Sequence, residues 1–408
     1  MKNNLLLRSL LLKISQTNTG TRCLCLFSIH LWLTYLVTLA FLLLPLLPAL
    51  FKYTISIFKQ MLALARIQRQ LSVNRLSSTL ITTRNNTTSS SKIHAALHTS
   101  AAKMSNPSSI LVSSPWLHHN LRKVKVLDCS WYLPFMSRNC KDEFSDAHIP
   151  GSHFFDIDEI KDMSKSDLPH MLPPPEFFGS SMDKLGISND DHVVVYDTSG
   201  VGPACRVFWT FRAMGHNKVS VLNGGFPDWV AHKYETESGA MPSPITGIHD
   251  ERKYTGHPAA NLVCHYTDVV GNIEKLKASC GTEGKQIIDA RPNGRFTGKE
   301  PEFRQGLSSG HMPHAINVPF TTVTEAPDPA NPQVQKLKSP ESLAKVFKGA
   351  GVDLSRPIIF TCGSGVTASV LYFAMLNAAG VSNNSNLTVY DGSWTEYALN
   401  PHSEIVKD

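Results

Sequence analysis

Two short segments of the chain are apolar throughout, and each precedes a segment with helical spacing. Residues 193–196 (VVVY) and 358–360 (IIF) are typical of strands buried on both faces of a parallel sheet. Residues 204–215 and 367–380 repeat apolar positions at helical intervals and end in glycine. The succession of strand, tight loop and helix predicts an open α/β fold, whose ligands bind at the carboxyl ends of the strands.

This pattern occurs twice along the chain, which indicates an internal duplication. Four landmarks recur in one order with nearly constant spacing: VKVLDCSW and QIIDARPNGRF, AHIPGSHFFDI and GHMPHAINVPF, HVVVYDTSG and PIIFTCGSG, VLNGGFPDW and VYDGSWTEY. We therefore expect two α/β domains, at residues 108–238 and 263–408. Residues 239–262, rich in Pro, Gly, Ser and charge without periodicity, are expected to link them.

The first 107 residues have a different character and are expected to form an extension. Residues 24–51 carry no Lys, Arg, Asp or Glu and are long enough to span a bilayer, although Pro45 and Pro48 would interrupt a helix. Residues 61–103 are rich in Ser, Thr and Arg and lack acids, which is typical of a mitochondrial presequence.

Two interpretations of this extension stay open. Either residues 1–60 anchor the chain to a membrane or act as a signal, or synthesis begins at Met61 or Met104 and residues 1–60 are an artefact or a minor isoform. A presequence is oddly placed behind a membrane span, so the second interpretation is preferred. We expect a mitochondrial protein, with the cytoplasm as the second choice.

The charge of the chain is divided between the extension and the rest. Twelve Lys or Arg and no acidic residue precede residue 108, which leaves 27 basic and 33 acidic residues after it, although the whole chain carries +6. The excess positive charge therefore belongs to the extension, and nucleic-acid binding is not expected. Of the eight cysteines none forms a C-x-x-C pair in the predicted domains, which favours a reducing compartment and argues against zinc. No metal or organic cofactor is predicted.

The most informative cysteine is Cys362, at the junction between a predicted strand and a predicted helix. It opens the loop Cys362-Gly-Ser-Gly-Val-Thr367, in which Gly363 and Gly365 permit a tight curl. The amide groups of such a loop converge, and the following helix directs its positive end to the same point. This position favours the nucleophilic thiolate. The other cysteines of the predicted domains, Cys129, Cys140, Cys205, Cys264 and Cys280, are interpreted as small apolar side chains.

The loop CGSGVTA, the HIPG-type turns and the DGSWTEY segment together resemble the tandem rhodanese-domain sulfurtransferases, and among these the 3-mercaptopyruvate sulfurtransferases. The resemblance covers residues from about 108 to 408. It implies two rhodanese-like domains, each an open, mostly parallel sheet flanked by helices. It also implies that Cys362 attacks the substrate sulfur, carries a persulfide and passes its outer sulfur to a thiol or to cyanide. Asp197 stands where the second loop has Cys362, so the first domain is expected to be catalytically silent.

The expected substrate is 3-mercaptopyruvate. Relatives that prefer the dianion thiosulfate have basic residues directly after the cysteine, whereas Gly363 and Ser364 are neutral here. The segment GRFTGKEPEFR matches the family's two substrate-binding arginines with Arg295 and Arg304, whose planar guanidinium groups suit a carboxylate. Arg291 is interpreted as structural.

The loop from Gly363 through Val366 and Thr367 is expected to hold the anionic sulfur, and Ser364 to shuttle a proton. The resemblance offers His148 of the first domain as the neighbour of Ser364, with a structural turn as the alternative role. Asn139 stands where a relay carboxylate is expected, with Asp142 and Asp146 nearby, which weakens a complete Ser–His–Asp relay. His311 is interpreted as structural.

Three other functions fit the sequence less well. A cysteine phosphatase needs Arg six places after the cysteine, and Ala368 stands there. A thiosulfate:cyanide sulfurtransferase is the closer rival. A non-enzymatic persulfide carrier or binding module would be favoured if Arg295 and Arg304 were absent. The family analogy suggests a thioredoxin-like dithiol as the sulfur acceptor.

Overall fold

The computed structural model describes residues 109–239, 253–326, 328–381 and 386–408. The expectations for residues 1–60, 61–107 and the central part of the predicted linker therefore lie outside the described residues. Within the described ranges, no helix combines the length and the apolar character that crossing a bilayer requires.

The first sheet contains five parallel strands in the order β1-β5-β4-β2-β3. The strands are β1 (Leu111–Val112), β2 (Lys125–Asp128), β3 (His153–Phe154), β4 (Val193–Tyr196) and β5 (Val219–Leu222). The helices of this half are α4 (Ser114–Asn120), α5 (Cys140–Asp146), α6 (Pro175–Lys184), α7 (Pro203–Ala213) and α8 (Gly225–Ala231), with 3-10 turns at Leu121–Lys123 and Pro134–Met136.

The second sheet repeats this topology in the order β6-β10-β9-β7-β8, again with parallel neighbours. Its strands are β6 (Val263–Cys264), β7 (Gln286–Asp289), β8 (Ala315–Asn317), β9 (Ile358–Thr361) and β10 (Leu387–Tyr390). Its helices are α9 (Tyr266–Ala278), α10 (Asn293–Phe296), α11 (Pro340–Gly349), α12 (Val366–Leu376) and α13 (Ser393–Leu399), with 3-10 turns at Ala260–Leu262 and Phe320–Val323. The predicted pair of parallel α/β units is confirmed.

The central strands are buried because helices cover both faces of each sheet. Every residue of β4 and β9 is buried, as their unbroken apolar sequences predict. The helix predicted over residues 367–380 ends earlier, at Leu376, because the chain then turns through Asn377 and reaches Gly380, whose φ is 85°.

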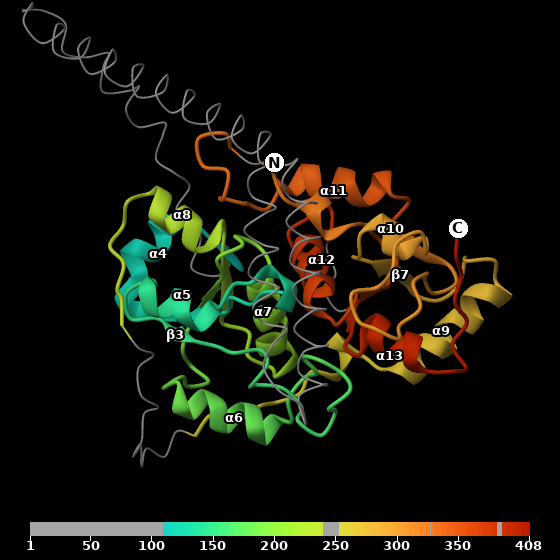
Figure 1. Cartoon of the computed structure of the whole chain (residues 1–408), viewed down its shortest axis with the longest axis horizontal. Helices are drawn as coiled ribbons and strands as arrows, with labels where there is room; N and C mark the ends of the chain where they lie inside the picture. The colour runs from blue at the N-terminus through green and yellow to red at the C-terminus, as the bar shows by residue number, and fades with distance from the viewer. Residues whose placement is uncertain (1–108, 240–252, 327, 382–385) are drawn as a thin grey trace, which may run out of the picture. The chain divides into compact units, whose positions relative to one another are not determined.

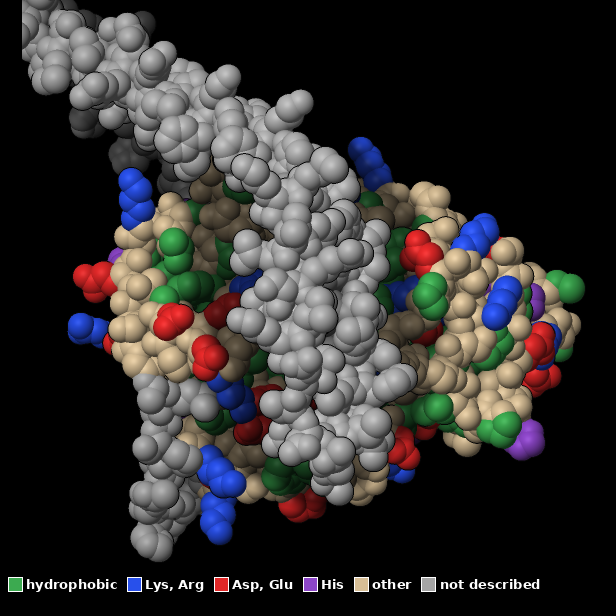
Figure 2. All heavy atoms as spheres, in the orientation of Figure 1, with side chains coloured by type: hydrophobic (Ala, Val, Ile, Leu, Met, Phe, Trp, Pro, Cys, Tyr) green, Lys and Arg blue, Asp and Glu red, His purple; other side chains and the backbone are tan. Residues whose placement is uncertain are grey.

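The two halves meet along helices α7 and α12, which lie next to each other near the middle of Figure 1. The rings of Phe208 in α7 and Phe373 in α12 meet edge to face at 4.9 Å. One cluster of buried apolar residues runs through both halves, so they share a core. On the face seen in Figure 2, acidic and basic side chains are interspersed among the described residues.

Candidate functional site

Cys362 is placed by the end of β9, directly before helix α12. The short loop between them turns at Gly365, whose φ of 81° is in the left-handed region that glycine tolerates. A side chain at Gly365 is also excluded sterically, because its Cβ would lie 2.6 Å from Nη1 of Arg206. Val366 and Thr367 form the first turn of α12.

The outer side of this loop is tied to the turn that begins helix α13. The amide of Cys362 donates to Oγ of Ser393 at 3.3 Å, and its carbonyl accepts from the amide of Trp394 at 2.8 Å. The carbonyl of Gly363 accepts from the amide of Thr395 at 3.1 Å and from its hydroxyl at 2.7 Å. These bonds fix the loop, and Cys362 is only 2% exposed.

The amide groups on the inner side of the loop are unused. Within the described ranges, the N–H groups of Gly363, Ser364 and Gly365 donate to no protein oxygen. Together with the amino end of α12 they form what we call the amide cradle. Such a group of amides suits an anion.

The corresponding loop of the first half already contains a carboxyl side chain of its own, that of Asp197. The carboxylate of Asp197 accepts from the amides of Ser199 at 2.8 Å, Gly202 at 2.9 Å and Ala204 at 2.9 Å. Burial raises the pKa of Asp197, and these amide bonds oppose the rise. Three amides of the first loop are thus occupied by a side chain of the same loop.

Arg304 lies beside the cysteine loop. Its Nη1 is 3.4 Å from Oγ1 of Thr395, the residue that binds the carbonyl of Gly363. Burial lowers the pKa of Arg304, while Cys362 and Glu302 act in the opposite direction. The guanidinium therefore lies near the cysteine loop, through its contact with Thr395.

Arg295, in helix α10, is held by Glu302 and Phe303. Its Nη1 lies 3.2 Å from Glu302 Oε2, and its guanidinium stacks over the ring of Phe303 at 4.1 Å. Its Nε is buried without a protein acceptor among the described residues. Arg295 is also close enough to contribute to the lowered pKa of Arg304. The two arginines thus form a neighbouring positive pair.

Arg291 has structural partners, as its position at a strand end indicates. It is 1% exposed and its Nη2 contacts Asp289 Oδ2 at 2.5 Å and the carbonyl of Gly310 at 2.7 Å. Its Nη1 contacts Glu302 at 2.7 Å, and its guanidinium covers the ring of Trp394 at 4.1 Å. Arg291 therefore ties the end of β7 to the segment that carries Arg304.

His148, one candidate for the proton relay, has its contacts within its own half. Its Nδ1 is 2.7 Å from the carbonyl of Phe144, its Nε2 is 3.8 Å from Glu237, and its ring stacks on Phe144 at 4.0 Å. His311 is held in the same way, by the carbonyl of Phe296 at 2.9 Å and its ring at 4.0 Å. Both nitrogens of His148 face oxygens of its own half, so its contacts are those of a turn residue.

Asn139, the residue at the expected carboxylate position, is a helix cap. Its side chain accepts from the amides of Lys141 at 3.0 Å and Asp142 at 3.4 Å, at the start of α5. This is the usual role of Asn at an N-cap. Asn139 therefore has a local structural function and does not orient an imidazole.

A different pair, His170 and Asp158, faces the second half. Nδ1 of His170 lies 3.2 Å from Oδ1 of Asp158, and Oδ2 of Asp158 accepts from the indole of Trp131 at 2.7 Å. Interaction with His170 lowers the pKa of Asp158 to about 2, so the carboxylate is ionised at neutral pH. The carbonyl of His170 accepts from Arg206, which also lies against Gly365, so the backbone of His170 is close to the cysteine loop.

Sequence reasoning missed this pair for a physical reason. Both residues lie between β3 and α6, where the chain has neither helical nor strand periodicity. The one available signal was the combination of His and a nearby Asp in the acidic segment after the first HIPG turn. His148, which belongs to the recognisable turn, drew the assignment instead.

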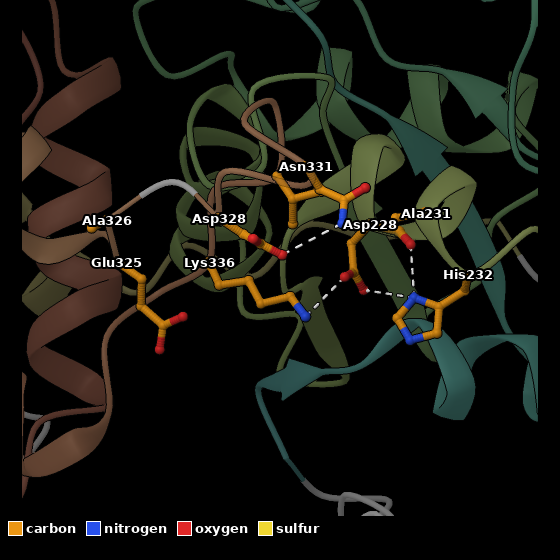
Figure 3. A pocket seen from close by; sticks show the side chains of 9 residues that line it. Asp228, Ala231, His232, Glu325, Ala326, Asp328, Asn331 and Lys336 are labelled. Carbon is orange, nitrogen blue, oxygen red and sulfur yellow. Dashed lines mark hydrogen bonds and ion pairs between the residues drawn. The ribbon is translucent and has the colours of Figure 1, made fainter. Parts of the chain in front are cut away.

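A cavity of about 370 Å³ is lined by residues of both halves, among them Asp228 and His232 of the first and Lys336 of the second (Figure 3). Its most buried carboxylate is already paired: Asp228 contacts Lys336 at 2.8 Å, His232 at 3.5 Å and the hydroxyl of Ser114 at 2.6 Å. The cavity includes no cysteine among its lining residues. These features do not provide a nucleophile, and the cysteine loop is the better candidate site.

The two parallel sheets of matching strand order define a duplicated α/β protein, with the cysteine loop in its second half. The family model of the rhodanese-like domain matches residues 113–232 and 272–400. A probable 3-mercaptopyruvate sulfurtransferase of Schizosaccharomyces pombe is 42% identical over 69% of this chain and 88% of its own length. The mitochondrial thiosulfate/3-mercaptopyruvate sulfurtransferase 1 of Arabidopsis thaliana is 39% identical over 76% of this chain and 81% of its own length.

Solved structures agree with these relatives. The 3-mercaptopyruvate sulfurtransferase SseA from Escherichia coli is 35% identical, with a TM-score of 0.58 over 70% of this chain and 99% of its own. The sulfur transferase subunit of yeast mitochondrial complex I is 40% identical, with a TM-score of 0.63 over 74% and 100%. The chain belongs to the rhodanese-like family.

Proposed function

We propose that the chain is a sulfurtransferase that takes the sulfur of 3-mercaptopyruvate onto Cys362 and then passes it to an acceptor. The observation that carries the proposal is the amide cradle, which has free N–H groups around a buried cysteine and a guanidinium beside it. The names of the relatives in several organisms support the same reaction.

The chemistry balances without a metal or an external redox partner. The thiolate of Cys362 attacks the substrate sulfur, the bond between that sulfur and C3 breaks, and its electron pair stays on C3. The proton of the substrate thiol is transferred to C3, so pyruvate leaves and Cys362 carries a persulfide. The cradle holds the negative charge of the persulfide until an acceptor thiolate or cyanide removes the outer sulfur.

The substrate is held by its carboxylate and ketone. Arg304, with Arg295 behind it, supplies guanidinium donors for these groups, and the cradle receives the sulfur end. The neutral residues Gly363 and Ser364 are less suited to a compact dianion. Thiosulfate remains a second donor because relatives at 39% identity are named for both compounds.

The proton is carried by Ser364 and His170, with Asp158 fixing the imidazole. Ser364 is 8% exposed within the cysteine loop, and His170 is 4% exposed at the interface. Burial is the main cause of the lowered pKa of His170, so the imidazole is neutral at pH 7 and can accept a proton. We propose this relay in place of the one through His148.

The remaining roles follow from this proposal. Residues 108–238 form the domain without a nucleophile, residues 239–262 the linker, and residues 263–408 the catalytic domain. A thioredoxin-like dithiol is the proposed acceptor, because a second thiol can release the sulfur as sulfide. We propose a mitochondrial location, supported by the acid-free segment 61–103 and by relatives described as mitochondrial.

The test is steady-state turnover of the full chain with 3-mercaptopyruvate and with thiosulfate, together with mass spectrometry of Cys362. We expect pyruvate formation, a mass gain of one sulfur on Cys362, and a kcat/KM for mercaptopyruvate at least about ten-fold above that for thiosulfate. Preference for thiosulfate would contradict the substrate assignment, and absence of turnover with both would contradict the proposed function.

Replacing Arg304 with glutamine should weaken substrate binding. Loss of a hydrogen bond to a charged group costs about 1.5–3 kcal/mol, which corresponds to about a 10- to 100-fold loss in kcat/KM for mercaptopyruvate. The exposed Arg122, in the 3-10 turn after α4, provides the matched Arg-to-Gln control and should leave kcat/KM unchanged. Equal kinetics of the two variants would remove Arg304 from the site.

Replacing His170 with asparagine should lower kcat for mercaptopyruvate about 100-fold, the usual contribution of general acid–base catalysis at its lower end. Because the pKa of His170 is lowered, kcat of the wild type should fall only at pH values below those at which an ordinary imidazole titrates. This acidic fall should disappear in the variant. The exposed His119 serves as the matched His-to-Asn control. If the His170 variant kept the pH profile of the wild type, His170 would be excluded from the proton transfer.

A further inference from the structure

A buried arginine of the first half contacts the cysteine loop of the second. Arg206, in helix α7, is 2% exposed and packs its guanidinium over the ring of Trp209 at 4.4 Å. Its Nη2 donates to Asp391 Oδ1 at 2.6 Å and also to the carbonyl of His170. Its Nη1 is buried, has no protein acceptor within the described ranges, and lies against Gly365.

Asp391, the partner of Arg206, binds the same segment at Leu172. It directly follows β10 and is 3% exposed, and its Oδ2 accepts from the amide of Leu172 at 2.8 Å. The pair therefore holds the carbonyl of His170 and the amide two residues later. We call Arg206 and Asp391 the clamp.

The clamped histidine has an unfavourable backbone conformation. The φ angle of His170 is 59°, in the left-handed region, which costs about 1–2 kcal/mol for a residue other than glycine. A conformation of this kind persists where surrounding contacts fix it. The two bonds of the clamp are contacts of that kind.

The duplication supplies an internal comparison. Asn223 is the counterpart of Asp391, and its Oδ1 accepts from the amide of Leu337 at 2.9 Å, as Asp391 accepts from Leu172. Ser369, the fourth residue of α12, is the counterpart of Arg206, the fourth residue of α7. The same backbone contact is thus made by a neutral residue on the side without the cysteine. The fold does not require the charged pair there, so its presence beside Cys362 calls for another explanation.

We propose that Arg206 and Asp391 are positioning residues that fix His170 against the cysteine loop for the proton transfer of the mercaptopyruvate reaction. The inference rests on the proposed function and assigns a role to a charged pair that spans the two halves. Because Arg206 touches both the carbonyl of His170 and Gly365, one side chain sets the place of the imidazole relative to the loop.

The two sulfur donors differ in the step that needs the clamp. Mercaptopyruvate must gain a proton at C3 when its carbon–sulfur bond breaks. Thiosulfate transfers its outer sulfur to the Cys362 thiolate and leaves as sulfite, with no proton taken up or released in the transfer. Inorganic tetrasulfide likewise leaves as trisulfide without a proton. A clamp that acts through His170 should therefore matter for mercaptopyruvate alone.

The experiment compares kcat/KM for mercaptopyruvate and thiosulfate in the full chain carrying R206M and D391N together. This double variant leaves no unpaired buried charge, and the amide oxygen introduced by D391N can keep the bond to Leu172, as Asn223 does to Leu337. We expect about a 10- to 100-fold loss with mercaptopyruvate, the scale of a small misplacement of a catalytic group, and a change of less than about three-fold with thiosulfate. Tetrasulfide replaces thiosulfate if wild-type turnover with thiosulfate is too slow to measure.

Two further variants separate positioning from folding. R206K keeps the positive charge but lacks the planar guanidinium group. It should therefore show the same selective loss with mercaptopyruvate, but a smaller one. It replaces the double variant in the experiment if the double variant does not fold. N223A breaks the matching contact on the other side and should change both donors by less than about three-fold. An equal loss with both donors, or no loss with mercaptopyruvate, would overturn the positioning role. A wild type that forms no pyruvate and no Cys362 persulfide would overturn the proposed function instead.

Discussion

Replacing Cys362 with serine should abolish sulfur transfer, with a loss in kcat of at least about 10⁴-fold, as expected when a covalent nucleophile is removed. A serine hydroxyl is not ionised at neutral pH, and its oxygen cannot carry a persulfide. The loop should survive the change, because its bonds to Ser393, Trp394 and Thr395 use backbone atoms of residues 362 and 363. The measurement is pyruvate release from mercaptopyruvate, with mass spectrometry of the protein.

The matched control is Cys280, an exposed cysteine after helix α9. C280S should keep full turnover, and its Cys362 should still gain the mass of one sulfur. If C362S kept activity, the nucleophile would have to be sought elsewhere and the catalytic assignment would be lost.

Replacing Arg291 with methionine should destabilise the protein by about 3–5 kcal/mol, the cost of removing one partner from a buried ion pair. The change leaves the carboxylates of Asp289 and Glu302 buried without Arg291, and their side chains are 0% and 4% exposed. Methionine keeps an unbranched apolar stem against Trp394, so lost packing is a minor part of the effect. Urea unfolding measures the difference.

An exposed ion pair provides the comparison. Arg138 contacts Glu143 at 2.6 Å, with 42% of its side chain exposed. R138M should therefore change the free energy of unfolding by less than about 1 kcal/mol, because solvent screens such pairs. If R138M and R291M lowered the free energy of unfolding by similar amounts, the structural role assigned to the buried Arg291 would be contradicted.

The parts of this molecule that could be predicted from sequence are those governed by regular periodicity. Strands β4 and β9 are apolar throughout because helices cover both faces of their sheets, and the loop after each strand repeats at matching positions. Cys362 was identifiable because it combines a strand end, two glycines and a helix start. These signals are local, and strand β9 and helix α12 lie on either side of Cys362 as the sequence pattern predicts.

The histidine that we propose as the partner of the cysteine loop could not be found in the same way. His170 lies in an irregular segment whose place is set by Arg206 and Asp391, 36 and more than 200 residues later in the chain. His148 is in a recognisable turn, yet its ring is occupied by Phe144 and Glu237. Long-range contacts of this kind leave no periodic signal, so sequence reasoning chose the more visible histidine.

The carboxylate of Asp197 within the first loop has a consequence for stoichiometry. Three backbone amides of that loop are bound by this side chain, so it cannot store a sulfur atom of its own. With Cys362 as the proposed carrier, each polypeptide should hold one sulfur atom at a time and must be emptied before it can be loaded again. Mixed rapidly with excess mercaptopyruvate and no other acceptor, it should release a burst of one equivalent of pyruvate per chain, followed by a slower phase in which the thiol of mercaptopyruvate itself removes the sulfur.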